Sequence, residues 1–206
     1  MAAREGTFIA FEGGDGAGKS TQVARLAAAF GDAGREVVLT RQPGGTELGS
    51  ELRDLVLHGG AISPRAEVLI FAADKAQHVD EVILPALLRG AVVITDRYTD
   101  SSVAYQGAGR ALGVRDVARL QDWAVAAVTP DLTVLVDVDP AEGRRRRGEV
   151  HDRLEAEADA FHHAVREHFL SLADAAPSRY LVVDGTRSPD GVAATVRARL
   201  SEEGLL

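Results

Sequence analysis

The sequence predicts an α/β fold, in which helices cover both faces of one five-stranded parallel sheet. Five short runs are almost continuously apolar and rich in β-branched residues, as is typical of strands buried on both faces. The stretches between these runs carry apolar residues at helical spacing. Strands that alternate with helices are joined by right-handed crossovers, which makes neighbouring strands parallel. No repeat or change of composition divides the chain, so we expect one domain spanning residues 1–206.

Each expected strand is a short run of β-forming residues. The strands are Thr7–Glu12, Glu36–Arg41, Ala91–Asp96, Leu132–Asp137 and Tyr180–Asp184. The first helix follows the first strand after a run of glycines, and it ends near Gly31 and Gly34. The later helices are expected at Leu48–Leu57, Arg65–Leu88, Val114–Val128, Glu155–Ala173 and Pro189–Leu200. Pro85 should stop or kink its helix, because proline removes a backbone donor and crowds the preceding turn.

The composition excludes several classes of protein. A net charge of −8 argues against a surface that tracks nucleic-acid phosphates, so we expect no nucleic-acid partner. The absence of cysteine excludes disulfides and thiolate metal sites, and no apolar run is long enough to predict a membrane span. Residues 1–6 lack the apolar segment of a signal peptide, which makes the cytoplasm the expected location. The absence of asparagine excludes the guanine-reading NKxD motif.

A phosphate-binding loop is predicted between the first strand and the first helix. Residues 13–20, GGDGAGKS, match the pattern G-x-x-x-x-G-K-[ST]. In this pattern the glycines let backbone N–H groups approach phosphates, the lysine reaches the β- and γ-phosphates, and the hydroxyl can ligate Mg²⁺. We therefore predict binding of ATP by Gly13, Gly14, Asp15, Gly16, Ala17, Gly18, Lys19, Ser20 and Thr21.

Two aspartates that end predicted strands are candidates for orienting the metal ion. Asp96 and Asp137 should both lie at the carboxyl edge of the sheet, where open α/β sheets bind ligands. Asp137 stands close to Asp139 and Pro140, a pair that resembles a helix cap followed by a proline in the first turn. Asp96 is directly followed by Arg97, which puts an acid and a base on one loop. The sequence therefore favours Ser20 and Asp96 as the Mg²⁺ residues.

Arginines at two places indicate phosphate recognition. Arg41 ends the second strand, so it should project beside the phosphate-binding loop. Four consecutive arginines precede Gly148 in an otherwise acidic chain, and Arg153 follows shortly afterwards. Such a run can be a solvated helix face, but near a phosphate-binding loop we favour a lid over residues 141–153. Guanidinium groups suit the neutralisation of a phosphoryl group in transfer.

The predicted helix at residues 65–88 carries paired side chains at helical spacing. Phe71 and Lys75 share one face because they are four residues apart, and so do Asp74 and His78. The spacing alone favours a core position for Phe71. Lys19 and Lys75 are the only lysines beside 21 arginines.

Several motifs in series resemble those of bacterial thymidylate kinases. In chain order they are GGDGAGKST, TRQPGGT, FAADKAQH, DRYTDSSVAYQG and an arginine-rich stretch that ends in RGEVHDRLE. The resemblance runs from about Phe8 to Leu172, which is most of the chain. It implies the P-loop nucleoside monophosphate kinase fold and the reaction of ATP with dTMP to give ADP and dTDP, with Mg²⁺. It also implies a homodimer.

The resemblance further implies roles for individual residues. Arg41 and Arg97 would grip the dTMP phosphate, and Asp15 would lie by the deoxyribose 3′-OH. Phe71 would stack on thymine and Lys75 would donate to its carbonyl, while Tyr105 would lie under the sugar. Ser102 and Gln106 would lie near the base. The catalytic cations would be Lys19 and Arg97 with the lid residues Arg147 and Arg153, as in relatives that supply a catalytic arginine from the lid.

Two departures from the family pattern lie in the acceptor motifs. The family usually has Glu in place of Gln42 and Arg in place of Lys75. Lysine can donate to a carbonyl but lacks the planar fork of arginine, so we expect altered affinity or base selectivity. Two other functions remain open at this point: a P-loop kinase for another nucleotide, and a nucleotide-binding switch protein with weakened catalysis.

Overall fold

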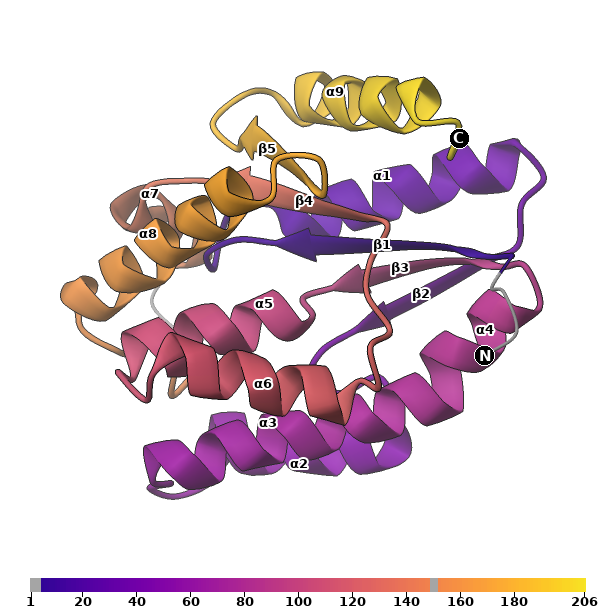
Figure 1. The fold of residues 1–206 in the computed structure, drawn as a ribbon. Coiled ribbons are helices and arrows are strands. Elements are labelled where there is room, and N and C mark those ends of the chain that lie inside the picture. The colour runs from indigo at the N-terminus through magenta and orange to yellow at the C-terminus, as the bar shows by residue number, and fades with distance from the viewer. Residues whose placement is uncertain (1–4, 149–151) are drawn as a thin grey trace.

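The sheet in the computed structural model has five strands, all parallel, in the order β2-β3-β1-β4-β5 (Figure 1). The structure describes residues 5–148 and 152–206, so residues 149–151 of the expected lid and residues 1–4 of the expected domain lie outside the described residues. The strands are β1 Thr7–Glu12, β2 Val37–Arg41, β3 Val92–Asp96, β4 Leu132–Asp137 and β5 Tyr180–Asp184. The predicted parallel α/β fold and its five strands are confirmed.

Helices cover both faces of this sheet. They are α1 Lys19–Asp32, α2 Glu47–His58, α3 Pro64–His78, α4 Leu84–Leu88, α5 Thr99–Ser102, α6 Val114–Ala124, α7 Pro140–Arg147, α8 Asp159–Ala175 and α9 Pro189–Glu202. Two π-helical segments, η1 Val79–Ile83 and η2 Val103–Gly109, continue α3 and α5. In Figure 1, α1 and α9 lie on one side of the sheet, and α3 to α6 lie on the other. Within the described residues no helix is both long and apolar enough to cross a bilayer.

The central strand β1 is buried on both faces. Ile9 and Phe11 pack into the core cluster that includes Phe30 of α1. Phe8 and Ala10, the alternate residues, belong to the opposite cluster with η1 and α4. Successive side chains of a strand point to opposite faces, so a strand covered on both sides must be apolar throughout. This is why the sequence of β1 lacks the alternation of a half-exposed strand.

The helix expected at residues 65–88 forms three consecutive segments. The chain does not stop at Pro85; it widens one turn earlier, where the Leu84 N–H bonds to the Val79 carbonyl five residues back. Pro85 itself lacks an N–H and crowds the preceding turn, which disfavours a regular α-helix there. The π-helical turn lets the helix pass the proline.

Two other helix boundaries differ from the prediction. α6 ends at Ala124, four residues before the expected Val128, because Ala126 and Ala127 adopt left-handed φ angles of 48° and 63°. α8 begins at Asp159 rather than Glu155, because the Asp152 carboxylate accepts the N–H groups of residues 154 and 155 and holds a separate turn. α5, η2 and α7 were not among the expected helices.

The strand register brings the functional strand ends together. Arg41 of β2 stands opposite Asp96 of β3, and Asp96 stands opposite Phe11 of β1. Asp137 of β4 pairs with Asp184 of β5. Parallel strands present all their carboxyl ends at one edge, so this edge collects both charged side chains and the phosphate-binding loop.

Candidate active site

The phosphate-binding loop joins the end of β1 to the start of α1. Gly13 and Gly16 have φ angles of 134° and 77°, which L side chains rarely adopt. A Cβ at Gly13 would lie 2.3 Å from the Val136 carbonyl oxygen, so β4 packs directly against the loop. Lys19 Nζ donates to the carbonyls of Gly13 and Gly14, at 3.1 and 2.8 Å. The loop and the N-terminus of α1 together provide an anion site.

Lys19 is held as a buried cation among charges of both signs. Its pKa is lowered to about 8, because the effects of burial and of the nearby Arg97 outweigh those of Asp96 and Asp15. An anionic ligand in the loop would favour the protonated form and replace the carbonyl partners of Nζ. The side chain is therefore suited to hold a phosphate.

Ser20 and Asp96 lie next to each other beside the loop. Ser20 Oγ donates to Asp96 Oδ2 at 2.8 Å. Asp137 is already engaged, because its two oxygens accept from Arg166 at 2.7 and 2.9 Å. A hydroxyl and a carboxylate next to a phosphate site fit Mg²⁺, which is usually bound by one or two protein oxygens together with substrate phosphates. In the described residues no cluster of three or more His, Cys, Asp or Glu side chains offers an all-protein metal site.

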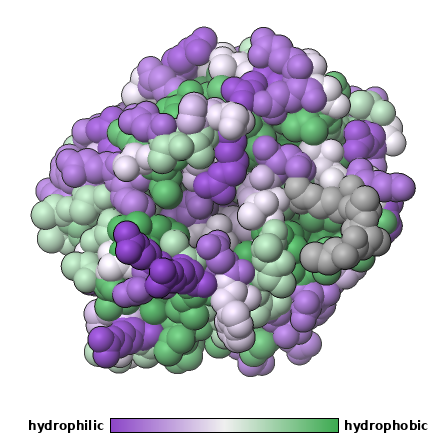
Figure 2. Space-filling model, viewed as in Figure 1, coloured by the Kyte–Doolittle hydropathy of each residue, from purple (hydrophilic) through white to green (hydrophobic). Residues whose placement is uncertain are grey.

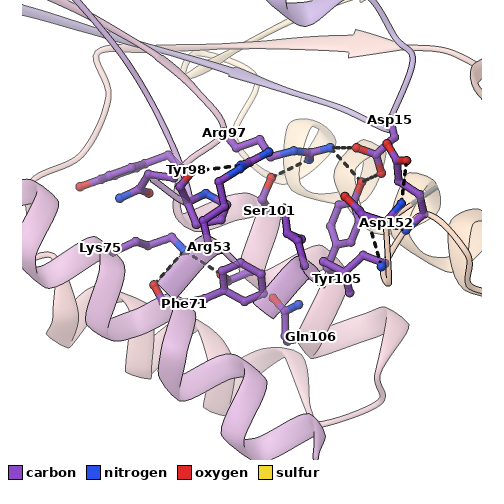
Figure 3. Close-up of a pocket in the computed structure, with 16 residues that line it drawn as sticks. Asp15, Arg53, Phe71, Lys75, Arg97, Tyr98, Ser101, Tyr105, Gln106 and Asp152 are labelled. Carbon is purple, nitrogen blue, oxygen red and sulfur yellow. Dashed lines mark hydrogen bonds and ion pairs between the residues drawn. The ribbon is translucent and has the colours of Figure 1, made fainter. Parts of the chain in front are cut away.

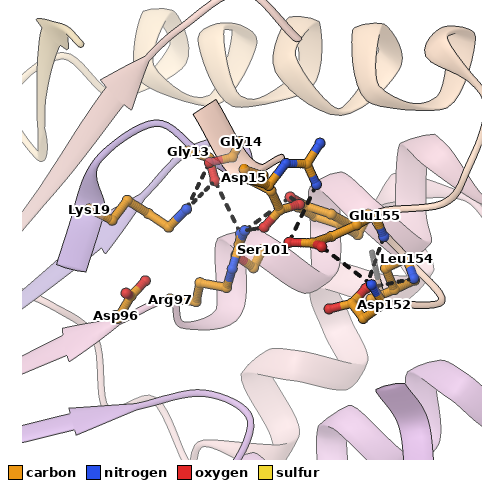
Figure 4. A network of polar contacts seen from close by, with 12 residues as sticks. Gly13, Gly14, Asp15, Lys19, Asp96, Arg97, Ser101, Asp152, Leu154 and Glu155 are labelled. Carbon is orange, nitrogen blue, oxygen red and sulfur yellow. Dashed lines mark hydrogen bonds and ion pairs between the residues drawn. The ribbon is translucent and has the colours of Figure 1, made fainter. Parts of the chain in front are cut away.

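Arg97 connects the loop to the helical segment after β3 (Figure 4). Its guanidinium forms an ion pair with Asp15 and donates to the Gly13 carbonyl at 3.1 Å. It also donates to Ser101 Oγ at 3.0 Å and to the Tyr105 hydroxyl at 3.1 Å. The Tyr105 hydroxyl in turn donates to Asp15 Oδ2 at 2.8 Å. Arg97 has a left-handed φ of 69°, so a strained backbone position aims this side chain at the loop.

This ion pair shifts the titration of Asp15. Burial acts to raise the Asp15 pKa, but Arg97, Lys19 and the Tyr105 hydroxyl together hold it far below the usual range of an aspartate. Asp15 is therefore a stable anion that organises the donors around it.

A pocket lies below Arg97 and is called the inner pocket (Figure 3). It is bounded by α3, by the segment α5–η2 and by residues at the end of the expected lid and just after it. The sequence-predicted residues that line it are Asp15, Phe71, Lys75, Arg97, Ser102, Tyr105 and Gln106. Phe71, expected in the core from its spacing, is buried but also forms part of this wall.

Lys75 is buried at the back of the inner pocket. Its Nζ donates to Ser102 Oγ at 2.8 Å and to the Phe71 carbonyl at 3.4 Å, and it lies 5.5 Å from the centre of the Phe71 ring. Burial lowers its pKa to about 8, while Asp74 opposes the shift. Gln42 lines the same pocket, and neither polar atom of its buried amide has a hydrogen-bond partner. A buried amide without partners is costly, so Gln42 is available to a ligand.

Glu67 organises the far wall of the inner pocket. Its buried carboxylate accepts from Gln106 Nε2 at 2.8 Å and pairs with Arg110 at 3.3 Å. Arg153 also pairs with Glu67, at 2.6 Å, and its Nε donates to the Val56 carbonyl at 2.8 Å. In this structure Arg153 therefore joins the end of the expected lid to α2 and α3.

The helix α7 lies against the phosphate-binding loop. A Cβ at Gly143 would lie 2.4 Å from the Asp15 carbonyl oxygen, so only glycine permits this close approach. Arg147, which follows on the same helix, forms an ion pair at 3.4 Å with Glu155, a residue that lines the inner pocket. The first part of the expected lid, residues 141–147, is thus helical.

A second pocket surrounds the loop itself and is called the loop pocket. Among its lining residues are Gly16, Gly18, Lys19, Ser20, Thr21, Arg41, Asp96 and Arg146. An outer groove continues from it over Ala17, Thr186, Pro189 and Val192. Ser188 caps α9 by accepting the Gly191 N–H at 3.2 Å, and Pro189 lies in the first turn of that helix.

Two arginines in these pockets were not singled out from the sequence. Arg53 of α2 lines both the inner pocket and the loop pocket, and it donates to the Pro43 carbonyl at 3.1 Å. Arg146 lines the loop pocket and the outer groove, and it donates to the Gly185 carbonyl at 3.0 Å. The local sequence gives no sign that Arg53 lines a pocket, because arginines are common on the polar face of an amphipathic helix. Arg146 was hidden within a run of four equivalent residues.

The loop pocket and the inner pocket meet at shared residues. Asp15, Gln42, Arg53 and Arg97 line both. The arrangement is therefore an anion site at the loop and a second ligand site with an aromatic wall, with cations at the junction. Such an arrangement can bring two phosphorylated ligands together for phosphoryl transfer.

Relatives with known names match almost the whole chain. A thymidylate kinase from Clavibacter michiganensis is 55% identical over 198 residues, which cover 94% of each chain. One from Cutibacterium acnes is 51% identical over 203 residues, with 98% of each chain covered. The crystal structure of thymidylate kinase from Ehrlichia chaffeensis superposes with a TM-score of 0.80 at 33% identity, and the match covers 95% of this chain and 98% of that one.

The family model described as thymidylate kinase matches residues 11–196. This range contains the phosphate-binding loop, Arg97, the inner pocket and α7. The chain belongs to the thymidylate kinase family.

Proposed function

We propose that this enzyme transfers the γ-phosphoryl group of ATP to dTMP, giving ADP and dTDP, as a step of dTTP synthesis in the cytoplasm. The observation that carries the proposal is the position of Arg97 between the loop pocket and the inner pocket, where it is fixed by Asp15. A donor phosphate in the loop and an acceptor phosphate in the inner pocket would both face this residue. Family membership supports the same reaction.

On the donor side, the loop and Lys19 bind the β- and γ-phosphates of ATP. Lys19 exchanges its carbonyl partners, Gly13 and Gly14, for phosphate oxygens. Ser20 and Asp96 hold Mg²⁺, which supplies charge neutralisation between the donor phosphates. The outer groove beside Thr186 and Pro189 receives the adenosine part of ATP.

On the acceptor side, the inner pocket binds dTMP. Phe71 stacks on thymine, and Arg97 binds the 5′-phosphate together with Arg41, which lines the adjoining loop pocket. Lys75 donates to a thymine carbonyl, an interaction that its buried position and its contact with the Phe71 ring support. Tyr105, held by Asp15, supports the sugar. The base-side positions are completed by Ser102 and Gln106.

The reaction needs no covalent intermediate, so the protein acts by positioning and by neutralising charge. Arg97 fixes the acceptor oxygen, and Lys19 stabilises charge on the transferred group. The lid arginines Arg147 and Arg153 approach that group when the lid closes and excludes water. Their present partners, Glu155 and Glu67, hold the guanidinium groups near the pocket until then.

The test is ADP release with ATP and Mg²⁺ in the presence of one acceptor at a time. We expect strong stimulation by dTMP, weaker stimulation by dUMP, and little by dCMP, dGMP, AMP or ribothymidine monophosphate. If another nucleoside monophosphate gave the strongest stimulation, that nucleotide and not dTMP would be the substrate. ATP binding without stimulation by any acceptor would support a nucleotide-binding switch protein and contradict the proposal.

Replacing Arg97 tests its central position. Arg97→Ala should lower kcat/KM for dTMP by at least about 100-fold, because it removes the cation that fixes the acceptor. ATP binding, measured by calorimetry, should change much less, since Lys19 and the loop remain. Arg35→Ala, an exposed substitution at the end of the α1 region, serves as the control. A folded Arg97→Ala enzyme with a near-normal rate would refute the acceptor role.

The titration of Lys75 predicts that kcat/KM for dTMP depends on pH, and that Lys75→Arg removes this dependence. With a pKa of about 8 in the free protein, Lys75 is charged at pH 7 and mostly neutral at pH 9. At saturating ATP, where the phosphates keep Lys19 protonated, kcat/KM for dTMP should fall by up to about tenfold over this interval. Lys75→Arg should give a nearly flat profile, because guanidinium stays charged. Equal decreases in both enzymes would contradict the role of Lys75.

The proposal includes a homodimer. Leu48 and Leu55 of α2 and Leu69 of α3 are exposed apolar side chains on two helices that pack together. Figure 2 shows apolar residues exposed between polar ones over the lower helices of Figure 1. Sedimentation at micromolar concentration should give twice the chain mass of 21.8 kDa, and Leu55→Glu should shift it toward the monomer. A monomer of the unaltered protein would contradict this part of the proposal.

A further inference from the structure

Glu12 is a buried carboxylate that the proposed reaction does not use. It is the last residue of β1, directly before the phosphate-binding loop, and its side chain is fully buried. Burial of an ionisable group carries a large free-energy cost unless hydrogen bonds or charges compensate. The contacts of Glu12 must therefore compensate this cost.

The Glu12 carboxylate accepts three hydrogen bonds from one short segment. Oε1 accepts from the backbone N–H groups of Tyr98 and Ser101, at 2.8 and 3.1 Å. Oε2 accepts from the Ser101 hydroxyl at 2.5 Å. All three donors lie just after Arg97, so the carboxylate fixes the turn by which the chain leaves β3.

The Ser101 hydroxyl links this carboxylate to Arg97. It donates to Glu12 and at the same time accepts from Arg97 NH1 at 3.0 Å. The Arg97 N–H bonds to the carbonyl of Phe11, the neighbour of Glu12, at 2.9 Å. The end of β1 thus holds Arg97 through its backbone and through its guanidinium. This arrangement maintains the left-handed φ of Arg97.

The carboxylate also lies in a mixed electrostatic field. Its pKa is raised to about 7, because the effects of burial and of Asp100 outweigh those of Arg97 and of the hydrogen bonds from Ser101 and Tyr98. The charged or titratable groups that interact with it electrostatically are Asp100, Arg97, Lys19, Lys75 and Tyr180. Arg97, Lys19 and Lys75 therefore oppose the cost of burying this carboxylate without cancelling it.

We propose that Glu12 is a positioning residue, which acts through the Ser101 hydroxyl to hold Arg97 in the orientation that binds the acceptor phosphate. This inference rests on the proposed function, because it requires a monophosphate acceptor at Arg97. Its specific content is that Glu12 serves acceptor binding, although in sequence it adjoins the donor loop.

Two substitutions interrupt the contacts from Glu12 through the Ser101 hydroxyl to Arg97 at different points. Glu12→Gln keeps one oxygen for the backbone N–H groups, but its NH₂ group cannot accept from the Ser101 hydroxyl. Ser101→Ala removes the hydroxyl and leaves Glu12 bonded to the two backbone N–H groups. Calorimetric binding of dTMP and of ATP should be measured for each variant, with steady-state kinetics and thermal unfolding.

We expect both variants to weaken dTMP binding and raise the dTMP KM by about tenfold, with ATP binding and ATP KM within about twofold of normal. The double variant should be no worse than the more severe single one, because both interrupt one pathway. Asp131→Asn is the matched control: Asp131 accepts the Phe8 N–H at 2.8 Å near the other end of β1, and its substitution should leave the dTMP KM unchanged.

The outcomes separate the two proposals. If the unaltered protein binds dTMP and both variants bind it normally, the positioning role is refuted while the kinase function stands. An equal loss of ATP and dTMP affinity would also refute it, since that result indicates a general structural role. If Glu12→Gln fails to fold, Ser101→Ala alone decides by the same criterion. Failure of the unaltered protein to bind dTMP would overturn the proposed function and this inference together.

Discussion

The ion pair of Arg97 with Asp15 is the interaction on which the arrangement of the site depends. It joins the phosphate-binding loop after β1 to the polar segment after β3, and Tyr105 completes it from η2. The segments that carry Asp15 and Arg97 are neighbours only because β1 and β3 pair in parallel and end at the same edge of the sheet. A partly buried pair of this kind contributes little net stability unless further hydrogen bonds satisfy both groups, and here they do. Its main consequence is a fixed orientation for a cation between two ligand pockets.

Around this pair, cationic side chains have protein partners that phosphate groups can displace. Lys19 is bonded to loop carbonyls, and the lid arginines lie against carboxylates such as Glu155 and Glu142. An anionic ligand offers Lys19 stronger partners than neutral carbonyls do, and it offers the arginines an alternative to their carboxylates. Substrate binding therefore exchanges existing contacts for new ones, and the site is largely organised beforehand. Preorganised cations of this type are the main means by which phosphoryl transfer is accelerated.

The fold could be predicted from the sequence because its signals are local. Continuous apolar runs defined the strands, and the spacing of glycines with Lys19 and Ser20 defined the loop. Features that depend on how distant segments pack were not predictable. Arg53 reaches the pockets only because of where α2 lies. α6 ends where two alanines adopt left-handed φ angles, and no glycine at these positions indicates this in the sequence. The partners of Arg153 likewise follow from the position of Glu67 on α3, which helical spacing alone does not reveal.

The central claim is that Arg97 faces the acceptor phosphate at the junction of the two pockets. The most direct test is a crystal structure of the enzyme with ADP, Mg²⁺ and dTMP bound together. The account predicts the dTMP phosphate within hydrogen-bonding distance of the Arg97 guanidinium, thymine against Phe71, and the ADP phosphates in the loop at Lys19. A dTMP phosphate bound away from Arg97, or thymine outside the inner pocket, would contradict it.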